Sequence, residues 1–337
     1  MSEIVPYKGG KTATRGYKAR VVSLEFAPGK ATKVRLENKL VGSGVCLGCE
    51  APRCKTKDAE ELALPALLSA FPGDPSFAVC PTSAIDVSDT SGVAVVDSKK
   101  CIGCGLCVVR CPYGAISMYS DGTVSVATAD PDGLTTPTPV PADTPNPLRS
   151  GRIGVLAGDR AQHLLAASTK LADSDRNLFV RNLLHEVGLL ARVRRRGDVN
   201  VRIDAVGSSK SGRIFVAEIE LVGGELEVPR ALLEDVAILH ARYGIPINEI
   251  DVLSVISSFP SSRSEYYQVI RDIQKVLGVS CKTLTIGALL ALVWAGKKLS
   301  SVGGSAFRVE EGGIDLAKSL DLPGQSEPYP GAFTPAK

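Results

Sequence analysis

Four cysteines recur at short intervals in the stretch Cys101-Ile-Gly-Cys-Gly-Leu-Cys-Val-Val-Arg-Cys111-Pro112. Two, two and three residues separate them, and a proline follows the last one. This spacing is typical of [4Fe–4S] ligand runs, in which three thiolates hold one cluster and the fourth reaches another. Gly103 and Gly105 suit the same chemistry, because backbone without side chains can approach inorganic sulfide and point its N–H groups at it. The stretch therefore predicts an iron–sulfur site.

A second set of cysteines lies upstream and supplies the partners that the fourth thiolate needs. Its members are Cys46, Cys49, Cys54 and Cys80, and Pro81 again follows the last one. Together the two sets provide eight thiolates, which is enough for two clusters. The crossed assignment places one cluster on Cys80, Cys101, Cys104 and Cys107, and the other on Cys46, Cys49, Cys54 and Cys111.

The segment from about residue 44 to residue 118 resembles the dicluster bacterial-type ferredoxins. The element Cys-Pro-x-x-Ala-Ile, which occurs at 80–85 and again at 111–116, carries much of that resemblance. The resemblance implies an α+β ferredoxin-like domain with two [4Fe–4S] clusters, and it implies one-electron transfer or redox sensing with a redox partner protein. Two spacings depart from the pattern, since four residues separate Cys49 from Cys54 and 25 separate Cys54 from Cys80. A zinc ion or a three-iron cluster therefore stays open for the first group.

Disulfides and zinc ribbons are the alternative uses of so many cysteines. The first eight residues contain no apolar segment of the kind that secretory signals carry, which argues against a secreted disulfide scaffold. Zinc ribbons favour separate Cys-x-x-Cys pairs over a compact run that ends in Cys-Pro. We therefore expect a reducing, cytoplasmic setting. The ninth cysteine, Cys281, lies in an apolar context that predicts an inert core thiol.

Composition narrows the function classes further. The chain has 337 residues, of which 44% are hydrophobic and 5% aromatic, as expected for a protein of two globular domains. The longest apolar run, 286–295, has about half of the roughly 20 residues that a bilayer helix needs, so no membrane span is predicted. The net charge of +3 means that any affinity for DNA has to come from a local basic patch.

Changes in composition predict five segments along the chain. Residues 1–43 form an N-terminal β-hairpin extension, with strands at 18–26 and 33–38. A helical insertion at 58–69 separates Cys54 from Cys80 inside the ferredoxin segment. Six prolines within 129–150 predict an extended linker. The predicted order is extension 1–43, ferredoxin domain 44–128, linker 129–150, α/β domain 151–322 and disordered tail 323–337.

The part after the linker has the pattern of an α/β domain. Apolar residues recur at helical spacing in some segments and alternate with polar residues in others. Pro229 favours a helix start, and Gly244 favours its end. The predicted helices are 173–192, 229–243, 264–277 and 284–297, and the predicted strands are 199–206, 213–222 and 251–257.

Three carboxylates stand out in this second domain. Asp204 lies near the end of one predicted strand, while Glu218 and Glu220 lie on the next. Residues two apart on a strand point to the same face, so Glu218 and Glu220 point together, and pairing of the strands would bring Asp204 beside them. Oxygen ligands in this arrangement suit a hard cation such as Mg²⁺ or Mn²⁺.

The order helix, Asp-bearing strand, Glu-x-Glu strand, helix, strand resembles the restriction-endonuclease-like superfamily over about residues 177–294. The resemblance implies an α/β restriction-endonuclease-like domain and a metal-dependent DNA nuclease. In it, Asp204 and Glu218 would hold the metal, Glu220 would be a further ligand or base, and Glu186 an accessory ligand. No proline precedes Asp204, and Glu220 stands where most members have lysine.

Simpler interpretations accompany this one. The alternate positions of the Glu-bearing strand are all apolar, so Glu218 and Glu220 would equally fit the water-facing side of an edge strand. The second domain would then be a docking module for a redox partner or a non-catalytic nucleic-acid-binding module. The sequence leaves the oligomeric state open. Five arginines would either neutralise phosphates or interact with a helix C-terminus: 192, 194, 195, 196 and 202.

Overall fold

A computed structural model divides the chain into two compact units. The first unit comprises Met1–Lys57 and Ala78–Leu156, and the second comprises Asp58–Phe77 and Ala157–Lys337. The structure describes residues 4–7, 14–28, 30, 33–41, 46, 48–90, 92–119, 122–128, 158–261, 263–301 and 332–333.

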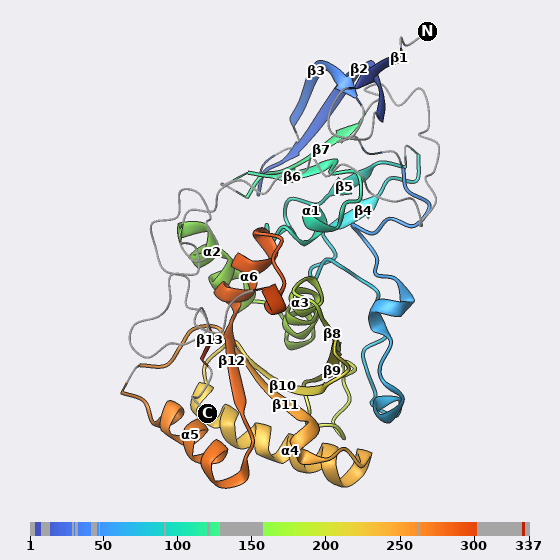
Figure 1. The fold of residues 1–337 in the computed structure, drawn as a ribbon. Helices are drawn as coiled ribbons and strands as arrows, with labels where there is room; N and C mark the ends of the chain where they lie inside the picture. The colour runs from blue at the N-terminus through green and yellow to red at the C-terminus, as the bar shows by residue number, and fades with distance from the viewer. Residues whose placement is uncertain are drawn as a thin grey trace. The chain divides into compact units, whose positions relative to one another are not determined.

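The first unit is built on a five-stranded sheet and a two-stranded sheet (Figure 1). In the larger sheet the strands follow the order β1-β2-β7-β6, and β3 pairs with β2. The smaller sheet pairs β4 with β5, and the short helix α1 follows it in the chain. The bounds are β1 Ile4–Tyr7, β2 Thr14–Phe26, β3 Lys33–Val41, β4 Ile85–Val87, β5 Ala94–Val96, α1 Leu106–Arg110, β6 Ile116–Met118 and β7 Val124–Thr128.

The expected N-terminal hairpin is present, and its strands are longer than the sequence predicts. β2 pairs antiparallel with β3 from Tyr17 opposite Val41 to Glu25 opposite Lys33. β2 also pairs with β7, so the hairpin shares a sheet with the segment that follows the cysteines. The hairpin of β2 and β3 is therefore joined to the segment after the cysteines by main-chain hydrogen bonds.

The segment between Cys54 and Cys80 differs from its prediction in two ways. It forms two short 3-10 helices, Ala59–Leu62 and Ala66–Leu68, because Pro65 between them cannot donate the hydrogen bond that a continuous helix needs. It also belongs to the second unit, so the predicted domain 44–128 has to be corrected at Asp58–Phe77.

The second unit contains a six-stranded mixed sheet in the order β13-β12-β11-β10-β9-β8. β8, β9 and β10 run antiparallel in succession, whereas β11 lies parallel to β10 and β12 parallel to β11. The strands are β8 Leu189–Val193, β9 Ala205–Ser209, β10 Ile214–Glu220, β11 Ile250–Ile256, β12 Cys281–Thr285 and β13 Ala332–Phe333.

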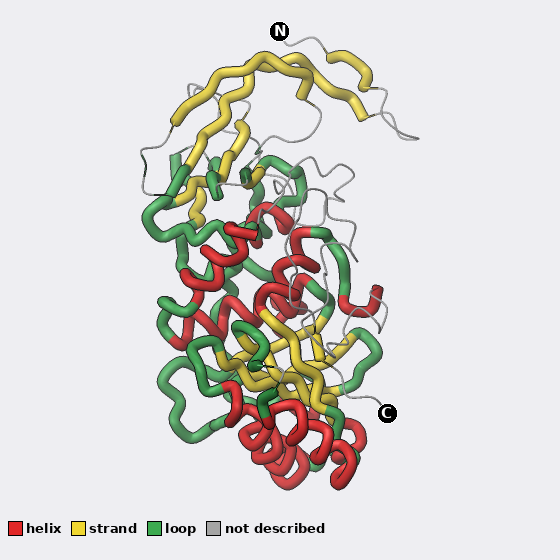
Figure 2. Tube along the Cα trace, turned by 90° about the vertical axis from the view of Figure 1, so that its left-hand side faces the viewer, coloured by secondary structure: helices red, strands yellow, loops and turns green. Residues whose placement is uncertain are grey.

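Helices cover both faces of this sheet (Figures 1 and 2). α4 packs on β10 and β11 and also contacts α5, while α3 packs on β8 and contacts α6 on the opposite face. Apolar side chains from α4, α5 and the strands between them form one continuous core. The helices are α2 Gly158–Ser168, α3 Asp173–Glu186, α4 Val228–Tyr243, α5 Glu265–Leu277 and α6 Ile286–Trp294.

Several element boundaries in the second unit differ from the sequence prediction. The helix expected over 173–192 ends at Glu186, because Gly188 adopts a φ of +97° and turns the chain into β8. The strand expected over 199–206 begins later and ends later, since β9 runs over Ala205–Ser209. Cys281 begins a strand that the prediction lacked, and it is buried there.

Two predicted segments lie wholly or mostly outside the described residues. These are the linker at 129–150 and the tail at 323–337. Within the tail, Ala332–Phe333 forms β13, which pairs with β12. The expectation of disorder is therefore wrong for these two residues. In the described part of the chain, no helix is both long and apolar enough to cross a membrane.

Candidate functional site

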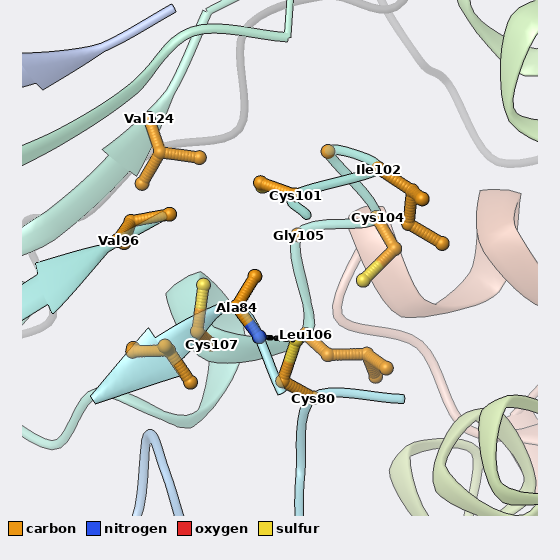
Figure 3. A pocket seen from close by; sticks show the side chains of 12 residues that line it. Cys80, Ala84, Val96, Cys101, Ile102, Cys104, Gly105, Leu106, Cys107 and Val124 are labelled. Atoms are coloured by element: carbon orange, nitrogen blue, oxygen red, sulfur yellow. Dashed lines mark hydrogen bonds between the residues drawn. The ribbon is translucent and has the colours of Figure 1, made fainter. Parts of the chain in front are cut away.

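Four cysteines of the first unit line one cavity (Figure 3). They are Cys80, Cys101, Cys104 and Cys107, the four that the motif assigns to a single cluster. The space among the lining residues, including the part open to solvent, is about 360 Å³. The remaining lining is apolar or glycine, and it comes from Ala84, Ile85, Val96, Ile102, Gly103, Gly105, Leu106 and Val124.

Glycines shape the loop that carries three of these thiols. Gly103 has a φ of 67° and Gly105 a φ of 79°, a left-handed conformation that other residues adopt at a steric cost. Gly105 is also the N-cap of α1, and this helix carries Cys107. The motif glycines therefore bend the chain so that residues close in sequence face one cavity.

The repeated Cys-Pro-x-x-Ala element forms the same turn twice. The Ala84 N–H donates to Cys80 Sγ at 3.2 Å, and the Ala115 N–H donates to Cys111 Sγ at 3.3 Å (the first is dashed in Figure 3). The residue before each alanine is left-handed, with φ 51° at Ser83 and 62° at Gly114. A hydrogen bond from the backbone stabilises negative charge on sulfur, as cluster ligands require.

The other four cysteines also influence one another. Burial raises the pKa of Cys49 to about 11, with further contributions from Cys46 and Cys111. Burial also raises the pKa of Cys54, followed by the charges of Cys111, Cys46 and Cys49. The Ala94 N–H lies 3.5 Å from Cys46 Sγ. The structure thus brings together the second predicted group, which contains the last cysteine of the 101–111 run.

Burial dominates the electrostatics of the cavity thiols as well. It raises the pKa of Cys104, and the nearby Cys80 adds to that shift. It raises the pKa of Cys107 in the same way, and Cys104 and then Cys101 make the largest further contributions. Buried thiols stay protonated on their own, so a metal that binds them has to displace protons.

Four thiols around one cavity can hold an iron–sulfur cluster. Within the described residues, no three His, Cys, Asp or Glu side chains are placed to hold a single metal ion. A [4Fe–4S] group makes a different demand, because each thiolate binds a separate iron and the four sulfurs stand apart around a cavity. Four thiols around an apolar cavity, with backbone N–H groups aimed at sulfur, satisfy that demand.

Asp204 of the second unit lies in a partly buried polar setting beside the strand ends. Its Oδ2 accepts the N–H of Ile219 at 3.1 Å, and Arg194 Nη2 donates to its Oδ1 at 3.4 Å. Burial raises the pKa of Asp204, while the Ile219 N–H, Arg194 and a hydrogen bond from Asn177 act to lower it. Asp204 therefore also satisfies the N–H of Ile219, which lies beyond the pairing of β10 with β9.

Glu218 and Asp235 share this region. Burial raises the pKa of Glu218 to about 8, with Asp204 and then Asp235 as the largest charge contributions. Burial and Asp204 raise the pKa of Asp235 to about 7. Asp235 is only 2% exposed, and its Oδ2 has no hydrogen-bond partner within the described part of the chain. We call Asp204, Glu218 and Asp235 the carboxylate cluster.

Sequence reasoning missed Asp235 because it lies on a helix and not on the strands. A signal was present, since Asp235 lies on the helix face that carries Leu232, Val236 and Leu239, which are buried positions of α4. A carboxylate on the apolar stripe of a helix is rarely left without a role. Its charge interactions show that α4 contributes to the carboxylate cluster.

The other predicted carboxylates are placed differently. Glu220 shares the Glu218 face of β10, but its Oε1 accepts the N–H of Val222 in the following loop. Glu186 ends α3, its carbonyl accepts Lys298 Nζ, and it is not among the charges that shift the pKa of the carboxylate cluster. The edge-strand interpretation of Glu218 is wrong, because β10 lies between β9 and β11.

The predicted arginines have mixed roles within the described residues. Arg192 Nη1 donates to the carbonyl of Leu62 at 3.0 Å, and Arg202 pairs with Glu234 at 3.4 Å. Arg194 binds the Val201 carbonyl in addition to Asp204. The side chains of Arg195 and Arg196 are exposed, so these two remain as candidates for phosphate contacts.

Comparison with known proteins supports an iron–sulfur segment. Residues 94–117 match the 4Fe-4S binding domain family (Fer4). The polyferredoxin-like subunit of an aliphatic sulfonate oxidoreductase from Pyrococcus furiosus is 41% identical over 59 residues, or 18% of this chain and 34% of that protein. A sulfite dehydrogenase subunit of Allochromatium vinosum is 31% identical over 110 residues, which are 33% of this chain and 34% of that protein. A tetrathionate reductase subunit of Salmonella typhimurium is 37% identical over 60 residues, which are 18% of this chain and 24% of that protein.

These matches cover parts of the molecules only. The chain spans about a third or less of the length of the curated relatives it matches. No solved structure matches it. The matches support a ferredoxin-like [4Fe–4S] segment, and they give no support to the nuclease resemblance of the second unit.

Proposed function

We propose that the first unit holds two [4Fe–4S] clusters and passes single electrons to or from a partner oxidoreductase. Two observations support this proposal. Cys80, Cys101, Cys104 and Cys107 line one cavity, and the charges of Cys111, Cys46 and Cys49 raise the pKa of Cys54. Clusters of this type supply one-electron chemistry when bound. The printed names of the relatives, which include subunits of an oxidoreductase, a dehydrogenase and a reductase, support the same class of reaction.

The chain's own residues have two roles in this function. The N–H groups of Ala84, Ala94 and Ala115 donate to sulfur and stabilise its negative charge. Apolar side chains of the cavity, including Val96 and Leu106, limit the access of water to the site. Both factors influence the reduction potential of a bound cluster.

A reductive titration tests the proposal. An anaerobically reconstituted chain is expected to take up about two electrons, one for each cluster, as followed by visible absorbance and electron paramagnetic resonance. Cys281→Ala is the matched control, because Cys281 is a buried cysteine of the second unit and should leave the uptake unchanged. Uptake of a single electron per chain would limit the protein to one cluster, and no uptake would contradict the function.

A second candidate function is hydrolysis of nucleic-acid phosphodiesters by the second unit. The order α3-β8-β9-β10-α4-β11 and the carboxylate cluster favour it. As they stand, these carboxylates do not form a single-ion site, so Mg²⁺ or Mn²⁺ would have to draw them together.

Cleavage assays separate this candidate from a docking or binding role. The loaded chain is incubated with single-stranded and double-stranded DNA and RNA in the presence of Mg²⁺ or Mn²⁺. Asp204→Asn and Glu218→Gln are expected to abolish cleavage. Asp251→Asn, which changes a carboxylate that pairs with Arg213 at 3.1 Å, should leave it intact. Absence of cleavage by the wild-type chain removes the candidate.

A further inference from the structure

The segment Asp58–Phe77, which we call the arm, connects the two units in an unusual way. In sequence it lies between two predicted cluster ligands, Cys54 and Cys80. In the structure it belongs to the second unit, whereas the chain on either side of it belongs to the first. The insertion that was expected to belong to the ferredoxin domain therefore belongs to the second unit.

The apolar side chains of the arm are part of the core of the second unit. Leu68 is fully buried and Phe71 is 5% exposed, and both pack in the core that includes Ile203, Val206 and Ile270. Removing a buried aliphatic side chain from such a core leaves a cavity and destabilises the fold. The arm is thus held in the second unit by core packing.

The main chain of the arm pairs with the end of β8, the last strand in the order of the described sheet, and with the two residues that follow it. Gly73 forms an antiparallel bridge with Arg194, the Asp74 N–H donates to the Val193 carbonyl at 2.7 Å, and the Arg195 N–H donates to the Pro72 carbonyl at 2.9 Å. These bonds satisfy backbone groups that an uncovered edge would leave open. The arm therefore orders the edge of the sheet.

Two arginines hold the arm through its carbonyls. Arg192 Nη1 donates to Leu62, and Arg181 Nη1 donates to the Ser76 carbonyl at 2.8 Å from a fully buried position. Gly73 is packed so closely that a Cβ at this position would lie 2.7 Å from Arg192 Nε. An alanine at Gly73 would displace the Arg192 side chain and weaken its bond to Leu62.

The base of the arm is closed next to the cysteines. Thr56 forms an antiparallel bridge with Ala78, and the Val79 N–H donates to the Lys55 carbonyl at 2.9 Å. Cys54 directly precedes Lys55 of this short stem, and Cys80 directly follows Val79. Whatever fixes these two thiols also fixes both strands of the stem, because the chain between them is short.

We propose that the arm couples cluster loading in the first unit to the order of the β8 edge in the second. This inference rests on the proposed function, because it needs clusters on Cys54 and Cys80. When both clusters are bound, the stem stays closed and the arm stays paired with the end of β8. Loss of the clusters frees the stem and loosens the pairing of Gly73 with Arg194. Since such coupling is reciprocal, weakening the contacts of the arm with the second unit also weakens cluster retention.

Cluster loss from arm variants tests the coupling. Leu68→Ala removes an arm side chain from the core, and Ile270→Ala is the matched control because it is equally buried in the same core without belonging to the arm. Gly73→Ala is a milder arm variant. After anaerobic reconstitution and iron counting, the loss of visible cluster absorbance is followed with an iron chelator. Leu68→Ala and Gly73→Ala should lose their clusters about 5–150-fold faster than the wild type, and Ile270→Ala within about twofold of it.

Hydrogen exchange supplies the second readout. Amides of residues 189–195 should exchange faster in the metal-free chain than in the loaded chain, while those of β11, in the interior of the sheet, should change less. Equal rates of cluster loss in Leu68→Ala and Ile270→Ala, or equal exchange of β8 with and without clusters, would overturn the coupling alone. A wild-type chain that retains no iron would remove the proposed function, and the coupling with it.

Discussion

The cysteine cavity of the first unit and the carboxylate cluster of the second both concentrate ionisable groups whose burial raises the pKa and so favours the neutral form. They differ in how far the chain satisfies them. At the cysteines, backbone N–H groups point at sulfur and two copies of one turn present the thiols, yet no cationic side chain is among the main influences on their pKa. At the carboxylates, Arg194, Asn177 and the Ile219 N–H already act on Asp204. The comparison indicates that the first site is organised around a group from outside the chain, while the second is partly satisfied from within.

The largest expected effect comes from removing one cavity thiol. Cys104→Ala should lose the cluster of the cavity and with it most of the stability of the segment around residues 44–118. Binding free energies of structural metals, about 10 kcal/mol or more, rival the whole stability of a domain, about 5–15 kcal/mol. Iron content and circular dichroism measure the change.

Cys281→Ala is again the control for this variant. It removes a buried thiol from β12 of the second unit, so iron content should stay at the wild-type level. If Cys104→Ala retained full iron and full stability, the cavity would not be organised around an external group, and the contrast with the carboxylates would disappear.

A smaller effect than the loss of a cavity thiol is expected from pH, which should change the stability of the second unit through the carboxylate cluster. Glu218 and Asp235 have a higher pKa in the folded chain, about 8 and about 7, than the usual values of 4.5 and 3.8. The folded state therefore binds their protons more tightly, and the stability of the second unit falls as the pH rises from about 4 to about 8. Above about pH 8 both carboxylates are ionised in the folded and unfolded states, so the stability falls no further on their account.

Asp235→Asn removes one of these buried charges and sharpens the test. It should stabilise the second unit by about 2 kcal/mol at pH 8 and reduce the slope of stability against pH. Urea unfolding at several pH values measures both quantities. Asp251→Asn, at a partly exposed ion pair with Arg213, is expected to change stability by less than about 1 kcal/mol and to leave the slope unchanged. A steeper slope in Asp235→Asn would mean that the carboxylate is stabilised by partners when charged.

The cysteine groups could be predicted from the sequence because their chemistry depends on short spacings. Residues 101–111 lie in one loop and one helical turn, so the intervals between the cysteines determine which of them face the same cavity. The Cys-Pro-x-x-Ala repeat could be recognised for the same reason, since each copy forms its turn locally. Periodicity also predicted α3 to α6, β10 and β11 of the second unit, whereas β8, β12 and β13 were not expected.

Features that depend on tertiary contacts were not predictable. Asp235 reaches the carboxylate cluster because α4 packs on β10; its place on the apolar stripe of the helix indicates a role, but no local pattern shows which strand the helix packs on. The helical composition of the arm gave no indication that Leu68 and Phe71 belong to the core of another unit. The end of α3 was misplaced because the apolar spacing continues past Gly188 into β8.

Iron and acid-labile sulfide analysis of the anaerobically purified and reconstituted wild-type chain tests the central claim most directly. Eight thiolates in two groups of four predict about eight irons and about eight sulfides per chain, with no stoichiometric zinc. About four of each would confine the site to one group of cysteines. Zinc in place of iron, or a chain that holds no sulfide, would contradict the account.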